Sequence, residues 1–177
     1  SICHYVLTKR DYQLLLVEAP QVEEGEVGEA IRWRLKDLIQ IPFDDAAIDI
    51  FHLPEDAYRG RIKMLYAVVS SKAYLRDRIR FLTECGLTPK VVDIPEMVLR
   101  NISLYLPETE MGSVALLSLR RSSGDMLMYS KDALYLTRQI ELGIKDFASK
   151  EEGFSLDNAN VLDRLALDIQ RSLDYYE

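Results

Sequence analysis

Two short, unbroken apolar runs constrain the fold of this chain more than any other feature of its sequence. The first covers residues 14–17 and the second residues 64–69. Runs of this length that do not alternate with polar residues are typical of strands covered on both faces of a sheet. We therefore predict buried strands over residues 13–18 and 62–70.

Helical and strand patterns alternate around these two runs. Apolar residues recur at helical spacing over residues 23–40 and again over 74–85, where Gly86 is well placed to end the helix. Short apolar segments predict strands over residues 46–53 and 91–94, and a turn over 55–60 follows the first of them. The resulting order, β-α-β-β-α-β, predicts a ferredoxin-like plan in which the first and third strands are central.

A different pattern begins near Pro95. A helix is predicted to start there and to run to about residue 106, with Asp93 and Glu96 at the spacing of a capping box. Three strands are then predicted as a meander. They cover residues 113–119, 125–130 and 133–141.

A polar stretch and a helix complete the chain. Residues 145–158 have no periodicity and are predicted to form a surface loop. The helix after them carries one apolar stripe, which consists of Leu162, Leu165, Ala166, Ile169, Leu173 and Tyr176. The chain opens in a strand-like segment at residues 2–7 and ends inside this helical pattern, so we interpret it as a fragment of a longer protein.

The composition argues against several classes of function. Lys and Arg number 22 against 29 Asp and Glu, a net charge of −7, so a nucleic acid is not an expected partner. No apolar run approaches the roughly 20 residues of a membrane-spanning helix, and no signal-peptide pattern is present. Cys3 and Cys85 are too few for a disulfide framework. We expect two free thiols and a cytoplasmic setting.

The sequence shows no convincing catalytic or metal-binding motif. His4 and His52 stand alone, and Cys85 falls on the flank of a buried helical stripe, where a thiol is usually inert. Gly-rich phosphate motifs are absent. An acidic group lacks the spacing of a calcium loop and is interpreted as a solvated edge; it consists of Asp44, Asp45, Asp49, Glu55 and Asp56. We therefore expect no enzyme, no cofactor and no metal.

Two surface features rise slightly above this background. Trp33 lies about half a turn from the apolar stripe of its helix and should face outward, as an interface anchor or as a packing residue against a neighbouring domain. Arg76 and Arg80, with Lys72 and Arg78, make the helix at 74–85 locally basic. That face is either solvated or a contact for an acidic partner or anionic lipid.

Four stretches together resemble the PilM-like family, the actin-like cytoplasmic components of type IV pilus assembly. They are residues 17–20 (VEAP), 30–42 (AIRWRLKDLIQIP), 91–96 (VVDIPE) and 165–176 (LALDIQRSLDYY). Each is moderately specific, and their order and spacing carry the weight. Members from the mannose-sensitive haemagglutinin (MSHA) pilus are most similar, and GspL-type cytoplasmic domains of type II secretion are more distant relatives.

The resemblance implies an α+β fold with two domains. Residues 1–94 would form a ferredoxin-like subdomain with its preceding strand, and residues 95–177 the truncated start of a second, RNase H-like lobe. Nucleotide-binding members carry a D-x-G phosphate loop in that lobe. Its counterpart here, residues 118–125, has Ser118 for Asp and Arg120 for Gly, before Gly124. A bulky side chain at that glycine would hinder phosphate, although two arginines could attract an anion.

The function implied is therefore a non-catalytic scaffold at the cytoplasmic face of the bacterial inner membrane. It would dock the short cytoplasmic tail of a membrane-spanning pilus assembly protein, with an assembly ATPase and a second copy of the chain as further candidate partners. Two alternatives remain open: an actin-like nucleotide-binding ATPase of the same machinery, and the equivalent scaffold of type II secretion.

Overall fold

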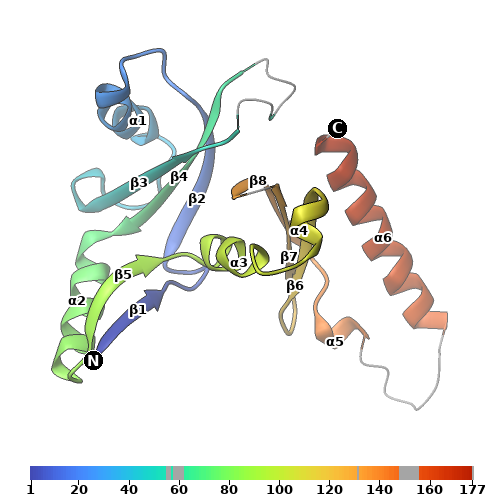
Figure 1. Ribbon diagram of the computed structural model, residues 1–177. Coiled ribbons are helices and arrows are strands. Elements are labelled where there is room, and N and C mark those ends of the chain that lie inside the picture. Colours follow the sequence, from blue (N-terminus) through green and yellow to red (C-terminus); the bar gives the residue numbers. More distant parts are fainter. Residues whose placement is uncertain (55–56, 58–61, 131, 148–155, 177) are drawn as a thin grey trace. The chain divides into compact units, whose positions relative to one another are not determined.

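The computed structural model describes residues 1–54, 57, 62–130, 132–147 and 156–176 (Figure 1). Within it the chain forms two compact units, Ser1–Val98 and Leu99–Glu177. The division falls four residues after the boundary expected from the sequence. Glu55, Asp56 and most of the turn predicted over 55–60 lie outside the described residues.

The first unit contains two sheets. Strand β1 (Ile2–Val6) pairs in parallel with β5 (Thr88–Asp93). Strands β2 (Tyr12–Glu18) and β3 (Ala46–His52) both pair antiparallel with β4 (Met64–Ser71), which is central. The third strand of the predicted plan is therefore central, as expected, whereas the first lies at an edge. The fourth, β5, joins a separate two-stranded sheet.

The strand order differs from the ferredoxin-like plan. An apolar run indicates that a strand is buried, but it does not indicate which strands pair with it. Strand β2 is covered on both faces although it is an edge strand. Val17 and Leu15 pack in the core under the first helix, while Tyr12 and Leu14 pack on the opposite face. An edge strand covered in this way has the same apolar sequence as a central one.

Helix α1 (Val27–Leu35) follows a 3₁₀ turn, Glu24–Glu26, and covers one face of this sheet. Val27, Ile31 and Leu35 are buried at helical spacing. The helix is shorter than the predicted 23–40, because the chain turns after Leu35, whose carbonyl accepts hydrogen bonds from two later amides. Leu38 lies in that turn and is exposed, so the apolar helical pattern predicted over residues 23–40 is wrong at this residue.

Helix α2 (Lys72–Glu84) begins at a cap built from two elements. The Ser71 hydroxyl accepts a hydrogen bond from the Tyr74 amide at 3.0 Å and donates one to the Asp45 carboxylate. Asp45 also accepts from the Ala73 amide at 3.0 Å. The bond from Ser71 is the main cause that lowers the pKa of Asp45. This member of the acidic group is therefore a helix cap.

The end of α2 differs from expectation at one residue. Gly86, with φ of 77°, ends the helix as predicted. Cys85, however, is exposed, since α2 is a surface helix with no buried side chain; the predicted flank of a buried stripe is wrong. Both cysteines are free in this structure.

Helix α3 (Pro95–Ser103) begins at the predicted proline. Asp93 accepts a hydrogen bond from the next amide, Ile94, at 2.8 Å. Glu96 is fully buried, forms an ion pair with Lys9 and accepts a 2.6 Å hydrogen bond from the Tyr12 hydroxyl. Both carboxylate oxygens of Glu96 thus have partners at or just before the start of β2, and its predicted capping role stays a prediction.

The second unit is a three-stranded meander with helices. Its strands are β6 (Ser113–Leu119), β7 (Gly124–Ser130) and β8 (Ala133–Ile140), with β7 in the centre, and its helices are α4 (Glu108–Met111), α5 (Ile144–Phe147) and α6 (Leu156–Tyr176). The meander is confirmed almost to the residue. Helix α5 occupies part of the predicted loop at 145–158, and residues 148–155 lie outside the described part of the chain.

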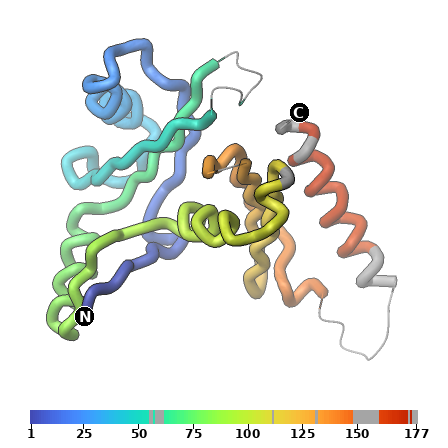
Figure 2. Tube along the Cα trace, viewed as in Figure 1, coloured from blue at the N-terminus to red at the C-terminus, as the bar shows by residue number. Residues whose placement is uncertain are grey.

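Helix α6 packs on the meander through Val161, Leu165 and Ile169. Leu162 and Ala166 belong to the predicted stripe but are exposed. The stripe is therefore rotated from the predicted one toward Val161. Figure 2 traces the chain from β1 to the end of this helix.

Candidate functional site

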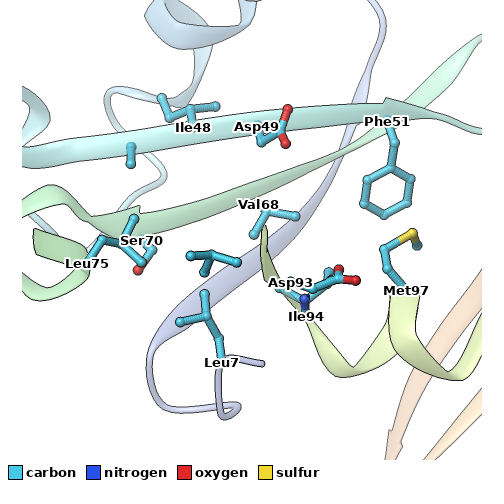
Figure 3. A pocket seen from close by; sticks show the side chains of 12 residues that line it. Leu7, Ile48, Asp49, Phe51, Val68, Ser70, Leu75, Asp93, Ile94 and Met97 are labelled. Atoms are coloured by element: carbon cyan, nitrogen blue, oxygen red, sulfur yellow. Dashed lines mark hydrogen bonds between the residues drawn. The ribbon is translucent and has the colours of Figure 1, made fainter. Parts of the chain in front are cut away.

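The first unit contains an open, largely apolar pocket of about 260 Å³ (Figure 3). It lies on the face of the β2–β4–β3 sheet that is turned away from α1. The side chains that line it come from β3, β4, α2, β5, α3 and the segment after β1: Leu7, Ala47, Ile48, Asp49, Phe51, Val68, Ser70, Leu75, Val92, Asp93, Ile94 and Met97.

The alternation of strand residues explains how the lining forms. On β3, Ile50 packs with the core under α1, so Ala47, Asp49 and Phe51 lie on the other face; Ile48 packs against that core and also lines the pocket. On the central strand, Leu65, Ala67 and Val69 likewise belong to the α1 core. The pocket is therefore the part of the second face over β3 that no other element covers.

Two unpaired strand edges border the pocket. Strand β3 pairs only with β4, and β5 pairs only with β1, among the residues that the structure describes. Backbone amides and carbonyls on such an edge are available to pair with an added extended segment. An apolar pocket lined by two such strands is suited to a peptide whose backbone pairs with one free edge while a side chain enters the pocket.

The charged side chains that line the pocket are all acidic. Among the described residues, Asp49 and Asp93 are the charged ones that line it. The Oδ1 atom of each accepts a hydrogen bond from the following backbone amide, Ile50 at 2.9 Å and Ile94 at 2.8 Å. Asp49 was assigned to a solvated acidic edge, and it is exposed. That it lines the same pocket as Asp93 depends on the tertiary fold.

A second, polar pocket of about 390 Å³ lies at the start of β2 and α2. It contains Asp11, whose carboxylate accepts two hydrogen bonds from Thr8, and Tyr74, whose hydroxyl lies 3.3 Å from that of Tyr5. Burial, followed by these neighbours, raises the pKa of Tyr74 to about 12. The Tyr74 hydroxyl is therefore protonated at neutral pH and serves as a structural hydrogen-bonding group.

Trp33 faces outward, as predicted, with 58% of its surface exposed. Its ring centroid lies 5.4 Å from that of Phe43, and the Lys36 ammonium lies 5.7 Å from the indole. The Arg32 guanidinium stacks 4.5 Å from the Phe43 ring. Trp33 thus contacts Phe43 and Lys36 while most of its surface remains exposed. Its interface role stays a prediction.

The predicted basic residues of α2 are exposed and separate from the pocket. Arg80 forms a 3.0 Å ion pair with Asp77, one turn before it, and both side chains are mostly exposed. Arg78 stacks 5.0 Å from the Tyr74 ring. Arg76 is also exposed. Exposed pairs of this kind contribute little to stability, about 0–1 kcal/mol.

The candidate phosphate loop forms the β6–β7 hairpin, as expected. Ser118 lies opposite Asp125 in the strand register. Arg120 forms an ion pair with Asp125, and its side chain also lies 3.2 Å from the Ser123 hydroxyl. A Cβ atom on Gly124 would lie 2.8 Å from the Leu119 side chain and 3.1 Å from the Ser118 carbonyl oxygen. The glycine thus allows close packing within the hairpin.

Gly143 is a part of this region that sequence reasoning missed. A Cβ atom there would lie 2.5 Å from the backbone nitrogens of both Ser122 and Ser123. The amides of Ile144 and Lys145 donate hydrogen bonds to the carbonyls of Arg120 and Arg121, at 2.8 and 2.9 Å. The chain after β8 therefore lies directly against the loop amides that would face a phosphate in a nucleotide-binding hairpin.

Neither a metal cluster nor a membrane span is found in the described part of the chain. No three His, Cys, Asp or Glu residues there are grouped so that they could hold a metal ion. No described helix is both long and apolar enough to cross a bilayer.

Comparison with known proteins shows which fold the chain has. No protein-family model matches the chain, and no curated protein matches it. Among solved structures, a chain of a PilM–PilN type IV pilus biogenesis complex matches with a TM-score of 0.70 and 19% identity, over 99% of this chain and 58% of that one. The fold is that of PilM. The expected α+β fold class is confirmed.

Two further structures are similar to the chain. The cytoplasmic domain of EpsL, an inner-membrane component of the type II secretion system of Vibrio cholerae, matches with a TM-score of 0.51 and 20% identity, over 88% of this chain and 59% of that one. A Bacteroides thetaiotaomicron protein described as having an actin-like ATPase fold matches with a TM-score of 0.41 and 10% identity, over 89% and 51%. The chain spans less than two thirds of PilM and of EpsL.

Proposed function

We propose that this chain is a non-catalytic docking component of a type IV pilus assembly platform, at the cytoplasmic face of the inner membrane. It holds a short cytoplasmic segment of a membrane-spanning partner in the apolar pocket of its first unit. The observation that carries the proposal is the pocket itself, an apolar lining to which two strands with an unpaired edge contribute. The PilM likeness supplies the biological setting.

The finer assignment is to the MSHA pilus, in which MshI is a protein that the chain resembles in sequence pattern. It rests on the resemblance of residues 17–20, 30–42, 91–96 and 165–176. The rival setting is the type II secretion platform, which the EpsL likeness supports. The genes encoded beside this chain distinguish the two.

We further propose that the chain does not hydrolyse ATP. The support is the β6–β7 hairpin, where Arg120 is already paired with Asp125 and Gly143 lies against the loop amides. A nucleotide phosphate would have to displace both. The rival function is an actin-like nucleotide-binding ATPase.

Calorimetric titration with ATP and Mg²⁺ tests this part of the proposal. We expect no saturable heat. A dissociation constant in the micromolar range would overturn the non-catalytic assignment and favour the ATPase.

Docking is tested with a fluorescently labelled synthetic peptide. Its sequence is that of the cytoplasmic tail of the membrane-spanning assembly protein encoded next to this chain, and binding is followed by anisotropy. Replacing Ala47 with Phe fills the pocket from β3 and should weaken binding at least tenfold, which is about 1.4 kcal/mol. The matched control is Ala166→Phe, the same substitution at an exposed position of α6.

The two variants separate the outcomes. Lost binding for Ala47→Phe with unchanged binding for Ala166→Phe supports docking at the pocket. Equal binding by both variants and the unmodified chain overturns it, as does a tail peptide that does not bind the unmodified chain.

A further inference from the structure

We infer that the segment held in the apolar pocket carries a basic residue beside its apolar anchor, and that Asp49 and Asp93 recognise this residue. The inference rests on the proposed function, because it specifies the chemistry of the segment docked there. The two carboxylates come from the two strands with free edges, β3 and β5, and both line the pocket (Figure 3).

The hydrogen bonding of the two carboxylates leaves each with one oxygen for a ligand. Oδ1 of Asp49 accepts from the Ile50 amide, and Oδ1 of Asp93 from the Ile94 amide. Among the described residues neither carboxylate forms an ion pair, and no Lys, Arg or His lines the pocket. The chain itself therefore does not neutralise this pair.

The environment makes the charge of an incoming segment decisive. The other ten lining residues are apolar except Ser70, so a segment that fills the pocket removes water from around the carboxylates. A carboxylate that loses water without gaining a cation is destabilised. A Lys or Arg that arrives with the apolar anchor offsets this cost, while an acidic residue at the same position adds repulsion.

A peptide explains the pocket better than a metal ion. Two carboxylates without a third ligand make a poor site for a divalent cation, and no group of three ligating residues occurs in the described ranges. Most of the lining is aliphatic or aromatic, which matches an apolar side chain. The occupant is thus a segment that is both cationic and apolar.

The test uses the tail peptide described above and a copy in which every Lys and Arg is replaced by Gln. We expect the Gln copy to bind the unmodified chain about tenfold more weakly. The Asp49→Asn/Asp93→Asn double variant should bind both peptides with similar affinity. Its binding of the original peptide should also depend less on salt. Asn keeps the oxygen that accepts each backbone hydrogen bond. The single variant Asp49→Asn, at an exposed residue, gives a second measurement of the preference between the two peptides.

The outcomes separate this inference from the proposed function. A tail peptide without a basic residue, equal binding of both peptides to the unmodified chain, or an unchanged preference in the double variant overturns the inference. If Ala47→Phe still abolishes binding in those cases, docking at the pocket stands and only the charge recognition fails. If the tail peptide does not bind the unmodified chain, both fail.

Discussion

Replacing Lys9 with Met is expected to lower the free energy of unfolding of the first unit by about 3 kcal/mol. The ion pair that Lys9 forms with Glu96 is asymmetric, because the Glu96 side chain is fully buried while 33% of the lysine side chain is exposed. Removing the lysine takes this cation away from the buried carboxylate, to which the Tyr12 hydroxyl also donates a hydrogen bond. Urea denaturation measures the loss.

A second substitution tests the cause of that loss. In the Lys9→Met/Glu96→Met double variant the buried charge is gone as well, so we expect part of the stability to return. Recovery should be incomplete, because the Tyr12 hydroxyl then loses its acceptor, at a cost of about 1–3 kcal/mol. Arg10→Met is the matched control at the exposed neighbouring residue. A Lys9→Met variant as stable as this control would show that the ion pair does not hold α3.

Truncating Leu35 to Ala is expected to cost about 2–5 kcal/mol, and truncating Trp33 to Ala much less. The two residues lie two positions apart on α1. Leu35 has no exposed surface and packs in the core above the sheet, whereas Trp33 is 58% exposed. The indole contacts Phe43 and Lys36, and such aromatic and cation–π contacts contribute about 0.5–1.5 kcal/mol each. Denaturant titration of both variants measures the difference.

The comparison also tests the predicted contact surface. Trp33→Ala should weaken self-association or partner binding, measured by sedimentation and by pull-down with the membrane-spanning partner. A loss of stability as large as that of Leu35→Ala would place the indole in the core and remove the argument for an interface. Unchanged association in both assays would leave Trp33 without an inferred role.

Local patterns were sufficient to predict most elements of the fold. The strands of the meander and the outward position of Trp33 depend on residues close in sequence, whose alternation or helical spacing directly reflects burial. The end of α1 was harder to predict from the sequence. The apolar pattern continues to Ile39, and the chain leaves the helix only because amides beyond Leu35 turn back to its carbonyl.

The pocket could not be predicted because its residues are distant in sequence. Leu7, Asp49 and Asp93 meet only when the parallel β1–β5 pair forms beside the antiparallel sheet, and no local pattern specifies which strands pair. Glu96 shows the same limit: its spacing from Asp93 suggested a helix cap, while its partners, Lys9 and Tyr12, lie more than eighty residues earlier. One available signal was the alternation of Ala47, Asp49 and Phe51 on a strand with a charged residue in the middle.

The free edge of β3 also has a consequence for the chain when nothing is bound to it. An unpaired, regular strand edge is a template on which another copy can add, the first step toward insoluble aggregates. A charge on such an edge is a common protection, and Asp49 is the exposed charge in the middle of β3. The same carboxylate would then serve two purposes: repelling identical strands while the edge is empty, and admitting only a segment of opposite charge.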